Sequence, residues 1–163
     1  MPYSQKYCLV SFIQPVAIGT EFNMADWPLH VTLADVFAIN SPQTYIEYEL
    51  AKLLSGQPSV NAFAMEEAIL GTTNVVLLNK TEDLINLHMI LVNLLEKNHA
   101  VFNSPEFTRE GFLPHCAVQI AERILTGDKV NIETIALVDM FPDGIWQQRK
   151  VIRNFKLQHA YTD

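Results

Sequence analysis

Hydrophobic residues along the chain alternate between runs typical of strands and spacings typical of helices. Leucine and isoleucine at helical spacing predict helices over residues 43–54 and 82–97. Apolar runs rich in β-forming residues predict strands over 7–13, 30–37, 60–70, 74–78, 115–121, 130–141 and 145–157. The predicted order is therefore strands, helix, strands, helix, strands.

Polar residues, proline and glycine mark the expected ends of the two helices. Ser41 followed by Pro42 predicts the start of the first helix, with Ser41 as its N-cap. Gly56 is expected to end that helix, and Thr81 to cap the second one. Each long helix thus has a defined beginning.

The strand predicted over 30–37 has two chemically different faces. Val31 and Leu33 fall on one face, whereas His30, Thr32 and Ala34 fall on the other, because side chains alternate along a strand. The histidine and the threonine are therefore expected to lie side by side on one surface.

Two segments of the chain, 27–33 and 112–118, resemble each other. Each contains an aromatic residue, a proline just before a histidine, and a strand-like run. Their separation is too long for a solenoid repeat and suits two lobes around a pseudo-twofold axis. With tight turns favouring antiparallel pairing, the sequence predicts one α+β domain over 1–163, built from two pseudo-symmetric lobes of antiparallel strands.

Composition narrows the class of protein. The chain has 163 residues, of which 49% are hydrophobic, enough for one buried core. No apolar run is long enough to span a membrane, and the first residues lack a signal-peptide pattern. Cys8 and Cys116 lie in apolar runs and are expected to be buried free thiols. We therefore expect a cytoplasmic monomer.

The formal charge of −7, from 11 basic and 18 acidic residues, bears on the choice of partner. Binding to long nucleic acid depends on many phosphate contacts made by basic residues, so the acidic balance argues against it. A small nucleotide or an RNA end, held by a few local groups, is compatible with this charge.

The two repeated histidines suggest chemistry at a phosphodiester. Imidazole titrates near neutral pH, so one histidine can deprotonate the attacking hydroxyl or water while the other protonates the leaving oxygen. His30 and His115, on pseudo-symmetric strands, suit opposite sides of one phosphate. Thr32 can hydrogen-bond a phosphate oxygen beside His30 and stabilise developing charge.

At these residues the sequence resembles the 2H phosphoesterase superfamily, which includes 2′-5′ RNA ligase-like and cyclic phosphodiesterase proteins. His30-Val31-Thr32-Leu33 matches the family's His-x-Thr/Ser motif, and Phe112-Leu113-Pro114-His115 resembles the approach to its second copy. The resemblance implies helices outside a bilobal fold, a central cleft holding both histidines, and metal-independent cleavage of 2′,3′-cyclic phosphates or related RNA-end phosphoesters. It implies no cofactor.

The chain departs from the family pattern in its second half. Ala117 stands where the family has Thr or Ser, and Ile120 stands near a position where many bacterial members have arginine. Gln119, which shares the strand parity of His115, and Arg149 are the replacement phosphate-binding residues that we expect. Lys150 is a further candidate, and Arg123 a weaker one.

The remaining candidates favour structural roles. His88 lies among leucines and is expected to be a helix-face residue rather than a ligand. No set of His, Cys, Asp and Glu has metal-ligand spacing, so no metal is expected. Trp27 and Trp146 can stack on a base, although packing is the commoner role of tryptophan.

Two further functions stay open beside the enzyme. The same cleft, weakened by Ala117 and Ile120, can bind a nucleotide or phosphorylated metabolite with little turnover. A pure interaction protein that merely keeps the fold is disfavoured because both histidines are present. The histidine that acts as the acid is not determined by the sequence.

Overall fold

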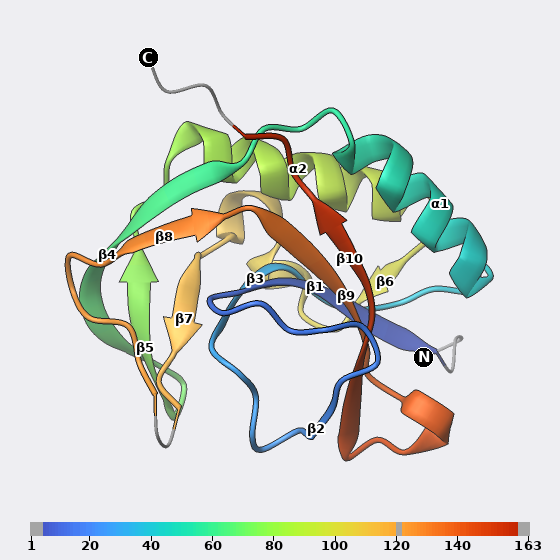
Figure 1. The fold of residues 1–163 in the computed structure, drawn as a ribbon, viewed down its shortest axis with the longest axis horizontal. Coiled ribbons are helices and arrows are strands. Elements are labelled where there is room, and N and C mark those ends of the chain that lie inside the picture. The colour runs from blue at the N-terminus through green and yellow to red at the C-terminus, as the bar shows by residue number, and fades with distance from the viewer. Residues whose placement is uncertain (1–4, 120–121, 160–163) are drawn as a thin grey trace.

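The computed structural model describes residues 5–119 and 122–159 (Figure 1). Its helices are α1 (Gln43–Leu54) and α2 (Glu82–Lys97), with short 3-10 turns η1 (Pro105–Phe107), η2 (Arg109–Gly111) and η3 (Pro142–Gly144). Its strands are β1 (Lys6–Phe12), β2 (Glu21–Asn23), β3 (His30–Ala38), β4 (Val60–Leu70), β5 (Thr73–Leu78), β6 (Val101–Phe102), β7 (His115–Ala117), β8 (Lys129–Ile132), β9 (Thr134–Asp139) and β10 (Gln148–Lys156).

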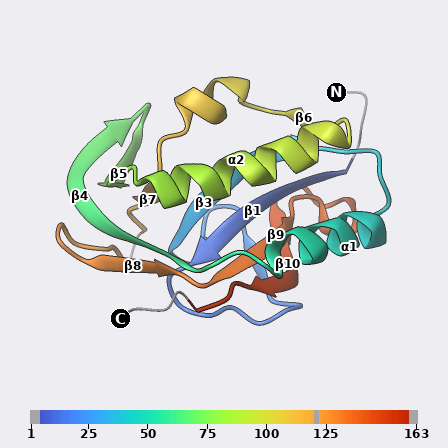
Figure 2. The same ribbon diagram turned by 90° about the horizontal axis from the view of Figure 1, so that it is seen from above.

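The strands form one sheet in the order β2-β10-β9-β1-β3-β7-β5-β4-β8, with β6 added to β3. All of these neighbouring strands pair antiparallel. Both helices lie on one side of the sheet, α2 across its middle and α1 nearer β10 (Figures 1 and 2). The predicted α+β class with antiparallel strands is confirmed.

Apolar side chains pack on both faces of the sheet. The larger core fills the space between the sheet and the helices, where α1 contributes Ile46, Leu50 and Leu54. A smaller cluster on the opposite face consists of Cys8, Val10, Ala136, Val138, Met140 and Val151. Both cysteines are free and buried, as expected. Neither helix in the described part of the chain is long and apolar enough to cross a membrane.

The segment predicted as one strand over 130–141 is two strands with different partners. β8 pairs with β4, whereas β9, which begins after Glu133, pairs with β1 and β10. The chain therefore crosses here from one end of the sheet to its other half. The alternation of hydrophobic residues continues through the crossing and does not indicate that the partner strand changes. The prediction of a single strand over 130–141 was therefore wrong. The short β2, which pairs with β10, was also missed.

The strand expected over 115–121 is shorter than predicted. β7 ends at Ala117. The Val118 N–H still bonds the Asn74 carbonyl of β5, but the next N–H, of Gln119, bonds the Glu122 carbonyl in its own segment instead of a neighbouring strand. Residues 120–121, including the position of Ile120, lie outside the described residues.

Both helices span the predicted residues, but only one has the predicted cap. The Thr81 hydroxyl accepts a 3.1 Å hydrogen bond from the Leu84 N–H, so Thr81 caps α2 as expected. Ser41 does not cap α1, because the N-cap position falls on Pro42 and no side chain bonds the first turn. Instead the Pro42 carbonyl accepts the first helical bonds, from the N–H groups of Tyr45 and Ile46.

Removing the two hydroxyls should therefore have unequal effects on stability. Thr81→Ala should lower the free energy of unfolding by about 1 kcal/mol, because one helix N–H loses its partner. Ser41→Ala, the matched control, should change it by less than about 0.5 kcal/mol. Urea unfolding followed by circular dichroism measures both, and equal losses would contradict this account of the caps.

Candidate active site

The two histidine strands meet at a single backbone pair. β3 and β7 lie next to each other in the sheet, and Val31 is paired with Cys116 in antiparallel register. Both side chains are buried in the core that faces the helices. Residues next to this pair along either strand therefore face the other side of the sheet, away from that core.

The antiparallel register places the two histidine motifs head to tail. One step along each strand from the central pair, His30 falls opposite Ala117 and Thr32 falls opposite His115. All four side chains share one face, and the two histidines occupy diagonal positions, for which cross-strand neighbours are typically about 7–8 Å apart. The structure thus places His30, His115 and Thr32 on the same face of the sheet.

Both imidazole rings are anchored in the same way. Nδ1 of His30 bonds the Pro28 carbonyl at 2.9 Å, and Nδ1 of His115 bonds the Leu113 carbonyl at 2.7 Å. A carbonyl only accepts, so Nδ1 carries the hydrogen in each ring. Within the described residues neither Nε2 has a recorded hydrogen bond, which leaves both Nε2 atoms available to take or give a proton.

His30 lies in an aromatic environment that favours its neutral form. Its ring centroid is 4.5 Å from that of Trp27 and 6.2 Å from that of Phe12. Burial lowers the pKa of His30, and charge on His115 lowers it further, against an opposing contribution from the bond to Pro28. Trp27 is thus packed against the candidate site, which the sequence left open.

A pocket of about 540 Å³ opens beside His115. Its polar lining includes His115, Thr32 and Asp35, but not His30, whose ring is packed as described above. Apolar residues form much of its remaining wall: Ile69, Leu70, Val75, Phe107, Phe112 and Leu113. The pocket can therefore hold a group with a flat or apolar part next to a polar end.

Asp35 was missed because β3 contains a bulge. Leu9 pairs with Ala34 and Val10 with Thr32, so Leu33 is an extra residue between two pairs. The bulge shifts the alternation, so that Ala34 is buried in the main core and Asp35 lines the pocket. The prediction that Ala34 shares the face of His30 was therefore wrong. Regular alternation carries no signal of such an insertion.

The other predicted phosphate contacts lie in different settings. Arg149 donates through Nη1 to the carbonyls of Met140, Trp146 and Gln148, and its buried Nε has no partner among the described residues. Gln119 follows β7, and its backbone N–H bonds the Glu122 carbonyl. Neither side chain lines the pocket beside His115.

A second pocket, of about 610 Å³, lies between the 11–16 segment and the strands β8, β9 and β10. Lys129 and Lys156 line it, together with Glu133. None of the site residues predicted from the sequence is part of its lining. The pocket beside His115 is therefore the one connected to the histidine motifs.

The fold itself has known counterparts. E. coli LigT, solved with NADP⁺, superposes with a TM-score of 0.62 at 15% sequence identity, covering 96% of this chain and 99% of that one. The chain has the LigT fold. A structure described as a phosphoesterase gives 0.60 at 15% identity, covering 94% and 98%. The protein TT0787 of Thermus thermophilus gives 0.57 at 16% identity, covering 96% and 100%.

No protein-family model matches the chain, and no curated protein is significantly similar to it in sequence. The likeness to LigT extends over 95–96% of the chain. It confirms the fold that the paired histidine segments suggested, although the pairwise identities are only 14–16%.

The lowered pKa values should make the protein less stable in mild acid. Burial holds the pKa of both His30 and His88 below 6.5 in the fold. Below that pH the unfolded chain therefore binds more protons than the folded one. The contribution of the two neutral histidines to the free energy of unfolding is complete above about pH 6.5 and is lost as the pH falls toward their lowered pKa values. Urea unfolding at a series of pH values measures the slope.

Two variants show how much of the dependence of stability on pH comes from His30. His30→Asn should reduce the slope without abolishing it, because one of the two groups with a lowered pKa is gone and His88 remains. His159→Gln, at an exposed position, should leave the slope as it is in the unmodified protein. Identical slopes in all three proteins would show that His30 titrates alike in the folded and unfolded states.

Proposed function

We propose that the chain is a metal-independent phosphoesterase that acts on a 2′,3′-cyclic phosphate or a related phosphoester of a small nucleotide or RNA end. The observation that carries this proposal is the head-to-tail register of the two motifs at the Val31–Cys116 pair. It sets two identically anchored histidines diagonally on one face, with both Nε2 atoms unbonded in the described part of the chain.

In the proposed reaction, His30 is the general base and His115 the general acid. Neutral His30, favoured by its lowered pKa, takes a proton from water through Nε2 as the water oxygen bonds to phosphorus. Protonated His115 gives its Nε2 proton to the leaving ribose oxygen as the bond from that oxygen to phosphorus breaks. The products are a phosphate monoester and a free ribose hydroxyl, and both histidines exchange protonation states.

The two halves of the site differ in how they can hold the phosphate. Thr32 offers a hydroxyl at the position opposite His115, whereas Ala117, opposite His30, offers none. We infer that Thr32 is the main side-chain donor to the non-bridging oxygens. Gln119 and Arg149 stay predictions as further donors. Loss of one such donor in an enzyme commonly costs on the order of a hundredfold in rate, so turnover is expected to be slow.

A small nucleotide suits the pocket beside His115. Aromatic and aliphatic side chains, among them Phe107 and Phe112, can contact a base, while Thr32 and His115 lie at the polar end. Structures of LigT complexed with 3′-AMP, ATP, NADP⁺ and phosphate support this ligand class by analogy of fold. The net charge of −7 favours a short ligand over a long nucleic acid.

The second candidate function is ligand binding in the same cleft with little turnover. Ala117 favours it, since one of the two motif positions lacks the hydroxyl that would grip the phosphate in the transition state. Under this alternative, phosphate ligands bind while no bond to phosphorus is cleaved.

Turnover of nucleoside 2′,3′-cyclic phosphates in the absence of added metal separates these two functions. Chromatography should detect the phosphate monoester, and His30→Ala and His115→Ala should each abolish its formation. His159→Ala, outside the site, is the control and should retain full activity. Binding of 3′-AMP without any product would instead support the binding protein, and absence of both would refute the site.

The missing hydroxyl can be put back. Ala117→Thr should raise kcat/KM for the cyclic phosphate by about tenfold, the value of one added hydrogen bond to a charged group. Ala117→Val, which has nearly the same shape without the hydroxyl, is the matched control and should give no gain. Thr32→Val should lower kcat by on the order of a hundredfold. Equal effects of threonine and valine at position 117 would exclude a hydroxyl contact there.

A further inference from the structure

His88 is a polar side chain in an otherwise apolar part of the structure. It lies on the face of α2 that packs into the main core, and only 1% of its surface is exposed. The prediction from the sequence that His88 lies on a helix face is correct. It did not include the hydrogen bonds that His88 makes. A buried imidazole needs hydrogen-bond partners, so the partners of His88 indicate what it does.

Both ring nitrogens of His88 are bonded to backbone groups. Nδ1 lies 2.6 Å from the Leu33 carbonyl, to which it donates, and Nε2 accepts the Arg109 N–H at 3.0 Å. Only the neutral ring with its hydrogen on Nδ1 makes both bonds. The ring also stacks on Phe112, with centroids 3.9 Å apart and planes inclined by 2°.

These contacts join the two strands of the candidate site through α2. Leu33 is the bulge residue directly after Thr32 in β3. Arg109 and Phe112 belong to the segment that leads into His115. One side chain on a helix thus holds the backbone next to the candidate phosphate-binding residue and the backbone that approaches the second histidine.

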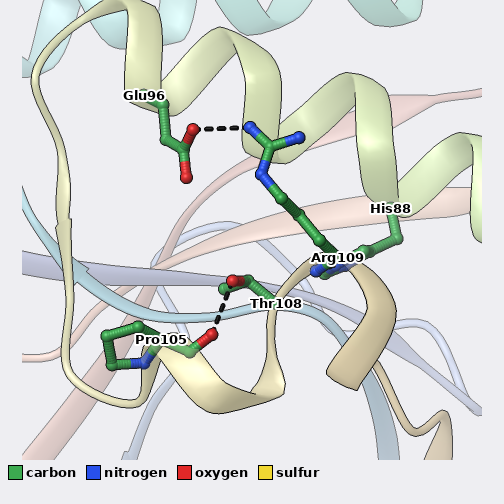
Figure 3. Close-up of polar contacts among 5 residues, drawn as sticks. All are labelled: His88, Glu96, Pro105, Thr108 and Arg109. Carbon is green, nitrogen blue, oxygen red and sulfur yellow. Dashed lines mark hydrogen bonds and ion pairs between the residues drawn. The ribbon is translucent and has the colours of Figure 1, made fainter.

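The segment before His115 also carries an ion pair to α2, but that pair is exposed and adds little to the attachment made by His88. Figure 3 shows the Arg109 guanidinium extending to Glu96 on α2, a 2.5 Å ion pair, while the backbone of Arg109 lies beside the ring of His88. Thr108 closes the preceding turn with a 2.6 Å bond to the Pro105 carbonyl. Arg109 has a positive φ of 58°, a less favoured backbone conformation for a residue other than glycine.

Such a link matters because the strands themselves are weakly joined. β7 has three residues, and its ladder with β3 consists of the Val31–Cys116 pair. That one pair fixes the register between β3 and β7, whereas β7 makes three pairs with β5 on its other side. We propose that His88 is a positioning residue, which ties β3 to the segment before β7 and thereby holds His115 against Thr32. The expected effect of His88 on catalysis rests on the proposed function, whereas its effect on the position of His115 does not.

The charges around His88 favour the form that makes both bonds. Burial lowers its pKa, and the cations of Lys80 and Arg109 lower it further. Asp35 and His115 face it across the shared pocket, and Glu110 lies next to Arg109 in η2. A protonated ring would turn Nε2 into a donor facing the Arg109 N–H, so that bond would be lost.

Substitution of His88 tests the role directly. His88→Phe keeps a ring to stack on Phe112 but removes both hydrogen bonds, whereas His88→Gln keeps an amide that can replace one of them. Glu96→Gln is the control, since it removes the exposed ion pair and leaves the His88 bonds in place. All proteins are first compared by circular dichroism to confirm folding.

Two readouts distinguish positioning from mere packing. With His88→Phe, affinity for inorganic phosphate should fall about tenfold and kcat/KM on cyclic phosphate about a hundredfold, with partial recovery in His88→Gln. The ring signals of His115 in NMR should shift in His88→Phe and stay unchanged in Glu96→Gln. With five histidines in the chain, these signals are readily assigned.

A folded His88→Phe protein with unchanged His115 signals and unchanged phosphate affinity would overturn the proposal. If His88→Phe does not fold, His88→Gln decides, and wild-type His115 signals together with wild-type phosphate affinity in that variant would overturn it too. Absence of turnover in the unmodified protein refutes the proposed function instead. The NMR comparison then still decides whether His88 positions His115.

Discussion

The candidate site depends on one antiparallel backbone pair, Val31 with Cys116. Because strand side chains alternate, burying these two in the core turns the residues on either side of them to the opposite face. Because the pairing is antiparallel, the two motifs run head to tail, and the histidines fall at diagonal positions. A slip of one residue would turn one motif into the core, so the apolar character of positions 31 and 116 specifies the site.

Local sequence signals were sufficient for much of the fold. The bounds of both helices, the Thr81 cap and the strands around the site follow from short-range periodicity and capping. The features that were missed depend on distant partners. The strand change at Glu133 is set by β4, β1 and β10, and the bulge at Leu33 by its pairing with β1. No local pattern encodes these partners.

The same distinction applies to the site. His30 and His115 were proposed because each half repeats a short pattern of aromatic, proline and histidine, and Thr32 because it follows His30 on the same face of the strand. Asp35 and His88 were not found, because the first reaches the pocket through a bulge and the second through bonds to backbone groups far along the chain. Backbone partners have no signature in the residue type that bonds them. The repeated histidine motifs can therefore be recognised in the sequence, whereas the contacts that hold them in place cannot.

The change of partner strand at Glu133 also affects the order in which the chain can fold during synthesis. β1, at the beginning of the chain, pairs with β9, so that Tyr7 lies opposite Asp139. During synthesis, one edge of β1 therefore cannot be covered until β9, which ends at Asp139, has emerged from the ribosome. Long-range pairing of this kind slows folding, and the edge of β1 that β9 covers stays unpaired until β9 has formed.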